Sequence, residues 1–448
     1  MSLTNPSSAS GASGPGSGRT NALKRTVQAS FETPTRNMGP QPYQPRYRVR
    51  DKYKIMGFIS SGTYGRVYKA TDRSGRPGEF AIKKFKPDKE GEQLAYTGIS
   101  QSAIREMSLC TELRHANVVK LIEIILEPKC IYIVFEFCEH DLLQIIHHHT
   151  QHPRRPIMPT AIKSIMFQLL NGCLYLHTNW ILHRDLKPAN IMVSSSGEVK
   201  IGDLGLARQF SKPLHSLFNG DKVVVTIWYR APELILGSHH YGPPIDMWAV
   251  GCIFAELLSL RPIFKGEEAK MDSKKTVPFQ RSQMQKIVDI MGMPTRDRWP
   301  LVGAMPEAGS LSLLMHPHHH HYNKMPNTSL LEKWYMQTIN GGNTPAASSS
   351  SGTPCPLVSL GAEGYRLLAG LLEYDPQRRL TAAQALQHPF FSSGDRLVAS
   401  CFEGLKNEYP LRRISPDDEM RTNGSIPGSK RSGLHDDSLG RASKRLKE

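Results

Sequence analysis

Residues 183–190 read HRDLKPAN, and this stretch decides how the rest of the chain is interpreted. It places an aspartate, Asp185, five residues before an asparagine, Asn190. A second acid, Asp203, follows thirteen residues after Asn190, directly behind the strand-like segment EVKIG at 198–202. Mg²⁺ binds through few protein ligands and completes its shell with phosphate oxygens and water. We therefore predict Asp185 as a general base, and Asn190 and Asp203 as ligands of Mg²⁺.

The chemistry that this pattern indicates is phosphoryl transfer, which needs positioned phosphates, a metal ion and a group that accepts the hydroxyl proton. Lys187 is expected near the transferred phosphate. A loop that approaches phosphates is present earlier, as ISSGTYGRV at 59–67. Its Gly62 and Gly65 remove side chains where the backbone must lie against a nucleotide. Ser60 stands at the first glycine of the usual Gly-x-Gly-x-x-Gly, so this loop alone is also compatible with an ordinary β-turn.

A lysine and an acid complete the set. Lys83 lies in the strand-like segment FAIKK, although lysines on strands often point to solvent. In the helical stretch 100–115, one face carries Ala103, Glu106, Cys110 and Leu113. Glu106 is the one charge in this apolar stripe, and a buried charge needs a partner. We predict Lys83 as that partner; the alternative is that Glu106 is a surface glutamate.

The remaining segments give the fold class. Residues 53–138 are mainly strand-like with one helical stretch, whereas apolar residues after 140 recur at helical spacing. A small strand-rich lobe followed by a larger helical lobe is an α+β arrangement. The motif APE at 231–233 places Glu233 where it needs a late arginine, and Arg379 is available. The five parts are the loop at 59–67, Lys83, Glu106, HRDLKPAN with Asp203, and APE with its arginine. Their occurrence by chance, in this order along the chain and at this spacing, is very unlikely.

Residues 53 to about 391 resemble a eukaryotic protein kinase of the cyclin-dependent branch. SQSAIRE at 100–106 resembles that branch's cyclin-docking helix, and VVVTIWYRAPELILG at 223–237 resembles its substrate-reading segment. Asp-Leu-Gly in place of Asp-Phe-Gly at 203–205, with the insert at 266–287, resembles the fungal Mediator-associated kinases that pair with cyclin C. The resemblance implies a two-lobed protein kinase fold, with an N-lobe at about 53–138 and a C-lobe at about 139–391. A disordered basic arm at 1–52 and a mostly disordered tail at 392–448 are expected beside it.

The same resemblance assigns the residues of the site. Asp185, Lys187, Lys83 and Glu106 would be catalytic, and Asp246 would brace the catalytic loop. The gatekeeper Phe135 would lie beside the adenine. ATP would be bound by Ile59, Ser60, Ser61, Gly62, Thr63, Tyr64, Gly65, Arg66, Val67, Lys83, Glu136, Cys138 and Asp141, with Asp141 at the ribose. The pocket that favours proline after the phosphorylated Ser or Thr would consist of Val224, Val225 and Arg230.

The segment between Asp203 and Glu233 raises the question of activation. Relatives that are activated by phosphate carry a threonine five residues before the position of Thr226, and here that position is Asp221. The arginines that grip the phosphate are present as Arg105, Arg184 and Arg208. A carboxylate supplies about −1 charge, whereas phosphothreonine supplies about −1.5 to −2. We therefore predict an active kinase that needs no phosphate at Asp221 and depends on its partners. A solvated Asp221, or displaced phosphosites at Ser211 and Ser216, are the alternatives.

The resemblance further implies a cyclin C-like cyclin and other Mediator kinase-module subunits as partners. Expected substrates are Ser/Thr-Pro sites in the RNA polymerase II C-terminal repeat and in transcription factors, with regulation or repression of transcription as the role. A pseudokinase-like scaffold is the alternative, which the departures at Ser60 and Leu204 favour. A direct nucleic-acid binder would rest on the formal net charge of +16 alone, without a recognisable module.

Composition and the termini bear on location. Seven cysteines without a Cys-x-x-Cys pair argue against a disulfide framework or a zinc site. No run of 18 apolar residues and no signal-peptide core is present, so we expect neither a membrane span nor secretion. Basic clusters at 430–431 and 444–447 suit a bipartite nuclear import signal or a solvated charge run. We expect a nuclear protein, and solvated loops in the histidine-rich stretches 147–152 and 316–321.

Overall fold

The computed structural model describes residues 47–61, 65–85, 101–127, 130–151, 155–210, 226–269, 278–314, 328–341, 355–405 and 408–416. The chain divides into two compact units, Met1–Tyr47 and Arg48–Glu448, and every element below belongs to the second. Several predicted positions lie outside the described residues: Gly62, Thr63, Tyr64, Ser211, Ser216, Asp221, Val224, Val225, the histidines at 316–321 and the basic clusters at 430–447.

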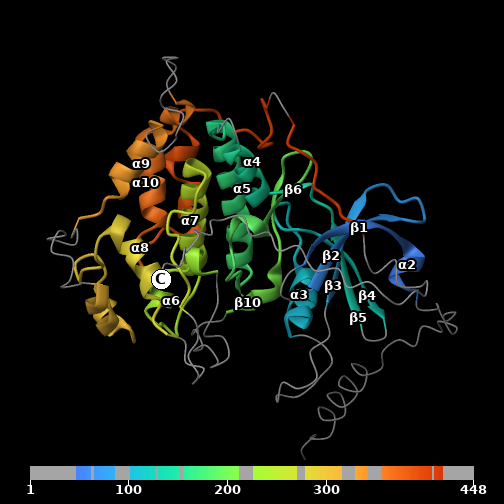
Figure 1. Cartoon of the computed structure of the whole chain (residues 1–448), viewed down its shortest axis with the longest axis horizontal. Coiled ribbons are helices and arrows are strands. Elements are labelled where there is room, and N and C mark those ends of the chain that lie inside the picture. Colours follow the sequence, from blue (N-terminus) through green and yellow to red (C-terminus); the bar gives the residue numbers. More distant parts are fainter. Residues whose placement is uncertain are drawn as a thin grey trace, which may run out of the picture. The chain divides into compact units, whose positions relative to one another are not determined.

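The small lobe is built on an antiparallel sheet of five strands in the order β1-β2-β3-β5-β4. These are β1 (Tyr53–Ser61), β2 (Gly65–Asp72), β3 (Glu79–Phe85), β4 (Leu121–Glu127) and β5 (Cys130–Glu136). The short α2 (Val49–Lys52) precedes the sheet, and α3 (Gln101–Glu112) lies beside it (Figure 1). Phe80 and Ile82 of β3 point into a core that also contains Tyr53 and Val134. Because side chains alternate along a strand, Lys83 then faces the opposite side, toward α3.

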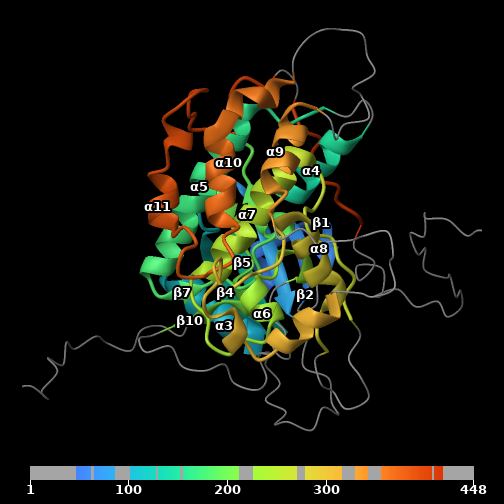
Figure 2. The same cartoon turned by 90° about the vertical axis from the view of Figure 1, so that its left-hand side faces the viewer.

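The large lobe is helical. Its helices are α4 (Leu142–Thr150), α5 (Pro159–Thr178), α6 (Pro232–Ile235), α7 (Pro244–Ser259), α8 (Arg281–Met291), α9 (Leu331–Ile339), α10 (Gly361–Leu371) and α11 (Ala382–Leu386). Residues 245–258 of α7 are all buried, as expected for a helix that is apolar on every side. Figure 1 shows α7 between α5 and α10, both of which it contacts, and in Figure 2 α11 lies beside α5.

Short strands and 3₁₀ turns carry the segments that sequence analysis singled out. The strands are β6 (His140–Asp141), β7 (Ile181–Leu182), β8 (Ile191–Val193), β9 (Val199–Ile201) and β10 (Arg208–Gln209). The 3₁₀ turns are η1 (Pro188–Asn190), η2 (Leu204–Leu206), η4 (Ile227–Tyr229), η5 (Val302–Ala304), η6 (Ala308–Leu314), η7 (Pro356–Leu360) and η8 (Pro389–Phe391). Ile191 pairs with Ile201 across the antiparallel β8–β9 ladder. This register brings Asn190, at the start of β8, close to Asp203, just after β9.

The α+β, two-lobed architecture agrees with the prediction. Two local expectations need correction. Residues 147–149 were expected in a loop but form the last turn of α4, since the apolar run Leu142–Ile146 continues the helix into them. Residues 392–405 and 408–416 were assigned to a mostly disordered tail, yet they pack on the two lobes through an aromatic residue, Tyr409, and an ion-paired arginine, Arg412. In the described parts of the chain, no helix is long and apolar enough to cross a membrane.

Candidate active site

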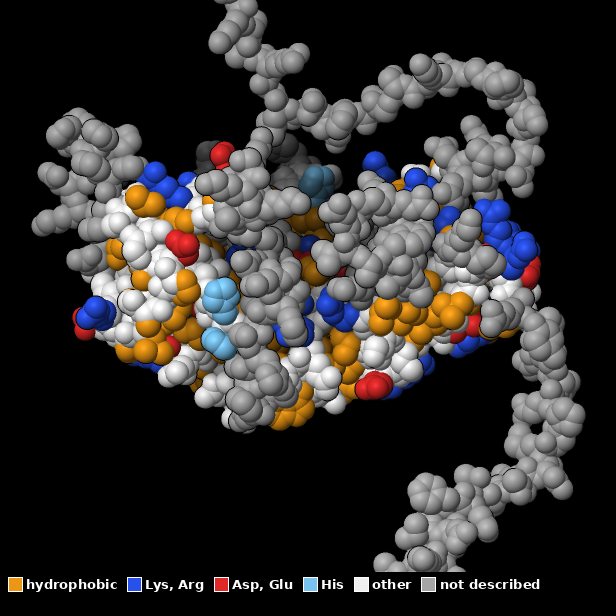
Figure 3. Space-filling model, turned by 90° about the horizontal axis from the view of Figure 1, so that it is seen from below, with side chains coloured by type: hydrophobic (Ala, Val, Ile, Leu, Met, Phe, Trp, Pro, Cys, Tyr) orange, Lys and Arg blue, Asp and Glu red, His pale blue; other side chains and the backbone are white. Residues whose placement is uncertain are grey.

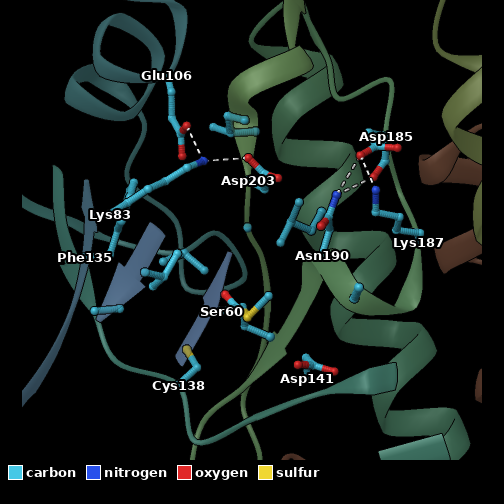
Figure 4. A pocket seen from close by; sticks show the side chains of 18 of the residues that line it. Ser60, Lys83, Glu106, Phe135, Cys138, Asp141, Asp185, Lys187, Asn190 and Asp203 are labelled. Atoms are coloured by element: carbon cyan, nitrogen blue, oxygen red, sulfur yellow. Dashed lines mark hydrogen bonds and ion pairs between the residues drawn. The ribbon is translucent and has the colours of Figure 1, made fainter. Parts of the chain in front are cut away.

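A cavity of about 680 Å³ lies between the sheet of the small lobe and the helical lobe (Figure 4). It collects most of the residues that sequence analysis assigned to nucleotide and catalysis. These are Ile59, Ser60, Ser61, Gly65, Val67, Lys83, Glu106, Phe135, Glu136, Cys138, Asp141, Asp185, Lys187, Asn190, Asp203 and Arg230. Arg66 differs, because it is not among the described residues that line the cavity. It lies between Gly65 and Val67 on β2, where strand alternation directs it to the other face.

The predicted pair of Lys83 and Glu106 is present. The Nζ atom of Lys83, on β3, lies 2.7 Å from Oε2 of Glu106, on α3. The same Nζ lies 2.9 Å from Oδ1 of Asp203, which follows β9 in the large lobe. Figure 4 shows the lysine extended between the two carboxylates. One ammonium group therefore connects a strand, a helix and the segment that carries the candidate metal ligand.

The protonation of this trio follows from burial and charge. Burial opposes the charge of Lys83, but Glu106 and Asp203 outweigh it and raise the pKa of the ammonium group. Burial raises the pKa of Glu106, and Lys83 offsets this effect only in part. Although burial acts to raise it, the neighbouring Lys83 holds the pKa of Asp203 below its usual range. Asp203 is therefore the carboxylate of the trio that is held most firmly in its charged form.

Asp185 lies across the cavity in a second polar cluster. Its Oδ2 accepts from Lys187 Nζ at 2.7 Å and from Asn190 Nδ2 at 3.1 Å. Its Oδ1 accepts from the hydroxyl of Thr226 at 3.0 Å, and Lys187 Nζ also donates to that hydroxyl at 3.1 Å. Thr226 was only the reference position for Asp221 above and was not among the predicted site residues. It joins the activation segment to the carboxylate that we predicted as the base.

Hydrogen bonds to Asp246 of α7 hold the loop that carries Asp185. The carboxylate of Asp246 accepts from the backbone N–H groups of His183 and Arg184, both at 2.9 Å, and lies 3.0 Å from Nε2 of His177. Although burial acts to raise it, the hydrogen bond from His177 holds the pKa of Asp246 below its usual range. Arg184 has a left-handed φ of 67°, a strained conformation for a residue with a side chain. The expected bracing contact is thus present, and it holds a strained turn in place.

The donor set at Asn190 and Asp203 fits a divalent cation. The amide nitrogen of Asn190 donates to the backbone oxygen of Asp185 at 2.8 Å, so the oxygen at the other end of the amide group is the atom that can bind a cation. Among the described residues no three His, Cys, Asp or Glu side chains gather into a metal-binding group. One amide oxygen and one carboxylate, completed by phosphate and water, are what Mg²⁺ accepts.

Leu204, the departure from Asp-Phe-Gly, is a packing residue. It is buried in η2, which packs against α3. Arg105 of α3 donates to the carbonyl oxygen of Gly205 at 3.0 Å, and Arg184 donates to that of Leu206 at 2.8 Å. Two of the three predicted arginines therefore contact the segment that leads to the third, Arg208. Their relation to Asp221 lies outside the described residues.

Two further arginines of the large lobe were assigned roles from the sequence, Arg379 as the partner of Glu233 and Arg230 in the proline pocket. Arg379 forms a two-pronged ion pair with Glu233, at 2.7 and 3.0 Å, and both side chains are buried. Arg230, predicted for the proline pocket, is buried and lies 3.7 Å from the carboxylate of Glu268, which belongs to the insert at 266–287. The insert therefore reaches the cavity through Glu268, a contact that the sequence did not predict.

Asp141, predicted at the ribose, has a partner that sequence analysis missed. Its Oδ2 lies 3.0 Å from Nη2 of Arg412, and Arg412 also lines the cavity. Burial raises the pKa of Asp141, while hydrogen bonds from Gln144 and the charge of Arg412 lower it in part. Nothing in the sequence YPLRRISP around Arg412 signals a contact with a residue 271 positions away.

Comparison with known proteins gives the family. The family model described as "Protein kinase domain" matches residues 53–391. A serine/threonine-protein kinase SSN3 of Chaetomium globosum is 68% identical, over 97% of this chain and 88% of the relative. The proteins of that name from Gibberella moniliformis and Pyricularia oryzae are 71% and 62% identical, over 91% and 100% of this chain and 94% and 100% of the relative. The chain therefore belongs to the protein kinase family, as an ATP-dependent serine/threonine kinase of the group named SSN3 in fungi.

Proposed function

We propose that this kinase transfers the γ-phosphate of ATP to Ser/Thr-Pro sites in the cavity between its lobes, as the cyclin-dependent kinase of the Mediator kinase module. The proposal that the chain catalyses phosphoryl transfer rests on one observation. The Lys83–Glu106 pair from the small lobe and the Asp185 cluster from the large lobe line the same cavity. Phosphoryl transfer is catalysed mainly by positioning and by charge, and these two groups supply both.

The nucleotide would enter with its adenine at the strand end of β5. There, Phe135 lines the wall and the backbone of Glu136 and Cys138 offers hydrogen-bonding groups to the base. The ribose would lie toward Asp141, and the phosphates toward Lys83. Glu106 holds that lysine at 2.7 Å, so its ammonium group is fixed before the phosphates arrive. Such preorganisation is worth more in a cavity than in water, because no solvent shell has to rearrange.

Asp185 would accept the proton of the attacking hydroxyl. Its Oδ1 accepts from Thr226, which orients the carboxylate, and its Oδ2 contacts Lys187. Lys187, whose Nζ lies 2.7 Å from Oδ2 of Asp185, would then contact the transferred phosphate. Asn190 and Asp203 would hold Mg²⁺, which supplies positive charge to the phosphate oxygens when bound.

The geometry supports an active enzyme over a pseudokinase-like scaffold. The departure at Leu204 changes a buried packing residue, whereas the neighbouring Asp203 keeps its contact with Lys83 at 2.9 Å. Ser60 lines the cavity at the end of β1, and it does not adopt a positive φ that would demand glycine. Neither departure therefore removes a charged group from the site.

Dependence on a cyclin C-like cyclin is supported by the surface beside α3. The side chains of Ile104 on α3 and Leu126 on β4 are 50% and 60% exposed. Figure 3, which views the side on which α3 and β4 lie, shows hydrophobic side chains gathered among Lys and Arg. A partner bound to exposed apolar side chains on α3 would fix the position of this helix, and with it the position of the buried Glu106. The proposal extends to further Mediator kinase-module subunits, a nuclear location, and the RNA polymerase II C-terminal repeat and transcription factors as substrates.

A kinase assay with purified protein tests this function. The chain is assayed with and without a cyclin C-like cyclin, on a peptide with a Ser-Pro site and on the same peptide with Ser-Ala. We expect phosphate transfer that requires the cyclin, prefers Ser-Pro and disappears in Asp185→Asn. Asp289→Asn, an exposed carboxylate on α8, is the matched control and should keep full activity. Equal activity of Asp185→Asn and the native protein would refute the assignment of the base.

The proposed independence from activating phosphate has its own test. The kinase–cyclin complex is treated with phosphatase and compared with its Asp221→Ala variant. We expect activity to survive the phosphatase, and to fall in the variant because the arginines then lose their anion. Loss of activity after phosphatase treatment would instead indicate a displaced phosphosite such as Ser211 or Ser216.

A further inference from the structure

The C-terminal segment 408–416, called the strap below, crosses from the large lobe to the small lobe. In Figure 1 it is the red segment that ends beside β1. It lies beyond residue 391, where the match to the kinase family model ends. The strap nevertheless contributes Arg412 to the wall of the central cavity.

The middle of the strap is fixed to the segment that joins the two lobes. The backbone N–H of Arg412 donates to Oε1 of Glu139 at 2.6 Å, and its Nε donates to the carbonyl oxygen of Glu139 at 3.3 Å. The other oxygen of Glu139 lies 3.7 Å from Nζ of Lys69 on β2. Nη2 of Arg412 completes the set at 3.0 Å from Oδ2 of Asp141. One arginine thus contacts two successive acids of the connection, and the first acid also reaches the sheet.

The two ends of the strap are held on opposite sides of this connection. Toward the large lobe, Tyr409 packs against the rings of His140, His148 and Phe402, at centroid distances of 5.9, 5.4 and 5.3 Å. Toward the small lobe, Ser415 forms an antiparallel bridge with Phe58 of β1, with N–O distances of 2.8 and 2.9 Å. A segment attached to both lobes limits how far they can separate.

The strap packs closely against Gly57 on β1 of the small lobe. A Cβ atom at Gly57 would lie 2.1 Å from Cγ2 of Ile414 and 2.8 Å from the carbonyl oxygen of Ser415. Any side chain at Gly57 would therefore displace the strap. β1 is also an edge strand, so its outer backbone groups are available for pairing. The close approach at Gly57 and the bridge at Phe58 are independent of the Arg412 contacts and place the strap on the same path.

The geometry at Asp141 indicates what the strap does there. Oδ1 of Asp141 accepts from the backbone N–H of Gln144 at 2.8 Å and caps α4, which leaves Oδ2 at the cavity. Oδ2 meets Arg412, and the two side chains are each 11% exposed. A carboxylate oxygen has room for more than one donor, so a ribose hydroxyl can share it with the guanidinium group. Without the arginine, the buried carboxylate would lose the positive charge that offsets its desolvation.

We propose that the strap is part of the nucleotide site, and that Arg412 is a positioning residue that holds the carboxylate of Asp141 oriented toward the ribose hydroxyls of ATP. The bridge at Ser415 adds to this by holding β1, one wall of the cavity, against the connection between the lobes. The proposal rests on the function proposed above, because it takes the ATP site to be this cavity. It concerns ATP affinity; the Asp185 cluster, and with it turnover, should be unaffected.

The test uses the full chain in complex with its cyclin. The Michaelis constants for ATP and for a Ser-Pro peptide are measured with kcat, and binding of the ATP analogue AMP-PNP and of 2′,3′-dideoxy-ATP is measured by calorimetry. Arg412→Ala should raise the KM for ATP by about tenfold, the loss expected for one charge-assisted hydrogen bond to a buried carboxylate. The peptide KM and kcat should stay within about twofold. The native protein should bind the dideoxy nucleotide less tightly than AMP-PNP, and Arg412→Ala should lose this preference.

Control variants separate positioning from general damage. Arg413→Ala alters the exposed neighbour on the strap and should change nothing. Arg412→Lys keeps the charge with fewer donors and should recover part of the affinity. Ser415→Pro removes the N–H that donates to Phe58 and should raise the KM for ATP by a few-fold, independently of Arg412.

The outcomes are distinct. An unchanged or lower KM for ATP in Arg412→Ala, or retained preference against the dideoxy nucleotide, would overturn the positioning role. If Arg412→Ala does not fold, Arg412→Lys and Ser415→Pro with native affinity would overturn it in the same way. If the native complex binds no AMP-PNP at all, the proposed function fails, and the inference fails with it.

Discussion

Two buried ion pairs of this kinase have similar chemistry and different surroundings. Glu106 and Glu233 are 1% and 4% exposed, and each contacts one cation at 2.7 Å. Arg379, the partner of Glu233, also donates to the carbonyl oxygens of Pro244, Glu373 and Tyr374, so the guanidinium group is saturated by protein. Lys83, the partner of Glu106, lines the cavity and reaches across it to Asp203 at 2.9 Å.

The comparison shows which polar groups form all their hydrogen bonds within the protein and which keep one for a ligand. An ammonium group has three N–H bonds, and the two contacts of Lys83 leave one for a ligand in the cavity. The Glu233–Arg379 pair offers nothing further and joins α6 to the segment before α11. We therefore expect that substitutions in the first pair reduce activity, and that substitutions in the second pair reduce stability.

The largest effect on stability is expected for Arg379→Ala. Removing one partner of a buried pair leaves the other charge uncompensated, which lowers the free energy of unfolding by about 3–5 kcal/mol. Chemical denaturation followed by fluorescence measures this change. Arg366→Ala is the control, because Arg366 is 62% exposed and its pair with Glu363 lies on the surface of α10. Equal stability of the two variants would show that the buried pair is not structural.

Asp203→Asn should affect turnover and leave the fold intact. The variant keeps the size of the side chain but removes the charge that faces Lys83 and, by our proposal, the metal. We expect kcat to fall by about 10²- to 10³-fold, as for the loss of one electrostatic contact in a transition state. The thermal midpoint should stay near that of the native protein. A lower thermal midpoint together with unchanged specific activity would instead show that Asp203 has a structural role, like the Glu233–Arg379 pair.

A matched substitution in both pairs gives the sharpest comparison. Glu106→Gln should lower kcat about tenfold, since Lys83 loses one of its two charged partners. Stability should change little, because Asp203 remains 2.9 Å from the ammonium group. Glu233→Gln should lower stability by about 1.5–3 kcal/mol through the hydrogen bonds to Arg379 that it weakens. Both variants need activity and denaturation measured on one preparation, and parallel losses in the two variants would contradict the distinction.

The smallest effect is expected for Ser60→Gly, which restores the usual glycine at the cavity. Ser60 lines the cavity without a charge and lies within β1. Glycine in a strand costs about 0.5–1 kcal/mol in stability because of its greater freedom in the unfolded chain. The KM for ATP should change less than threefold. A tenfold change would mean that Ser60 contacts the nucleotide directly. An uncharged side chain that lines the cavity would then also determine the KM for ATP.

Much of the site could be predicted because its signals are local or periodic. The helical spacing around Glu106 gave its burial and its need for a cation, and the structure has Lys83 there at 2.7 Å. HRDLKPAN and Asp203 are adjacent through one short hairpin, so their spacing along the chain already implies proximity. The α+β lobes followed from the change of period near residue 140. The roles of these residues in catalysis stay predictions that the experiments above address.

The contacts that escaped prediction join segments that are distant in the chain. Arg412 and Asp141 are 271 residues apart, and the strap has no periodic pattern from which its contacts could be predicted. The contact of Thr226 with Asp185 joins residues 41 positions apart, and no periodic pattern connects them. The histidines 147–149 were misjudged as a loop because composition outweighed the helix that precedes them. The helix ends only at Thr150, so these histidines form its last turn.

The bridge between Phe58 and Ser415 also bears on solubility. An uncovered edge strand is a template on which a second chain can pair, and β1 is such an edge in the sheet of the small lobe. Ser415 occupies part of it, and Pro416, which has no N–H, cannot extend the ladder. A protein shortened at residue 391, where the match to the family model ends, would keep every candidate catalytic residue and lose this cover. Such a shortened kinase should self-associate through β1 at concentrations where the full chain stays monodisperse.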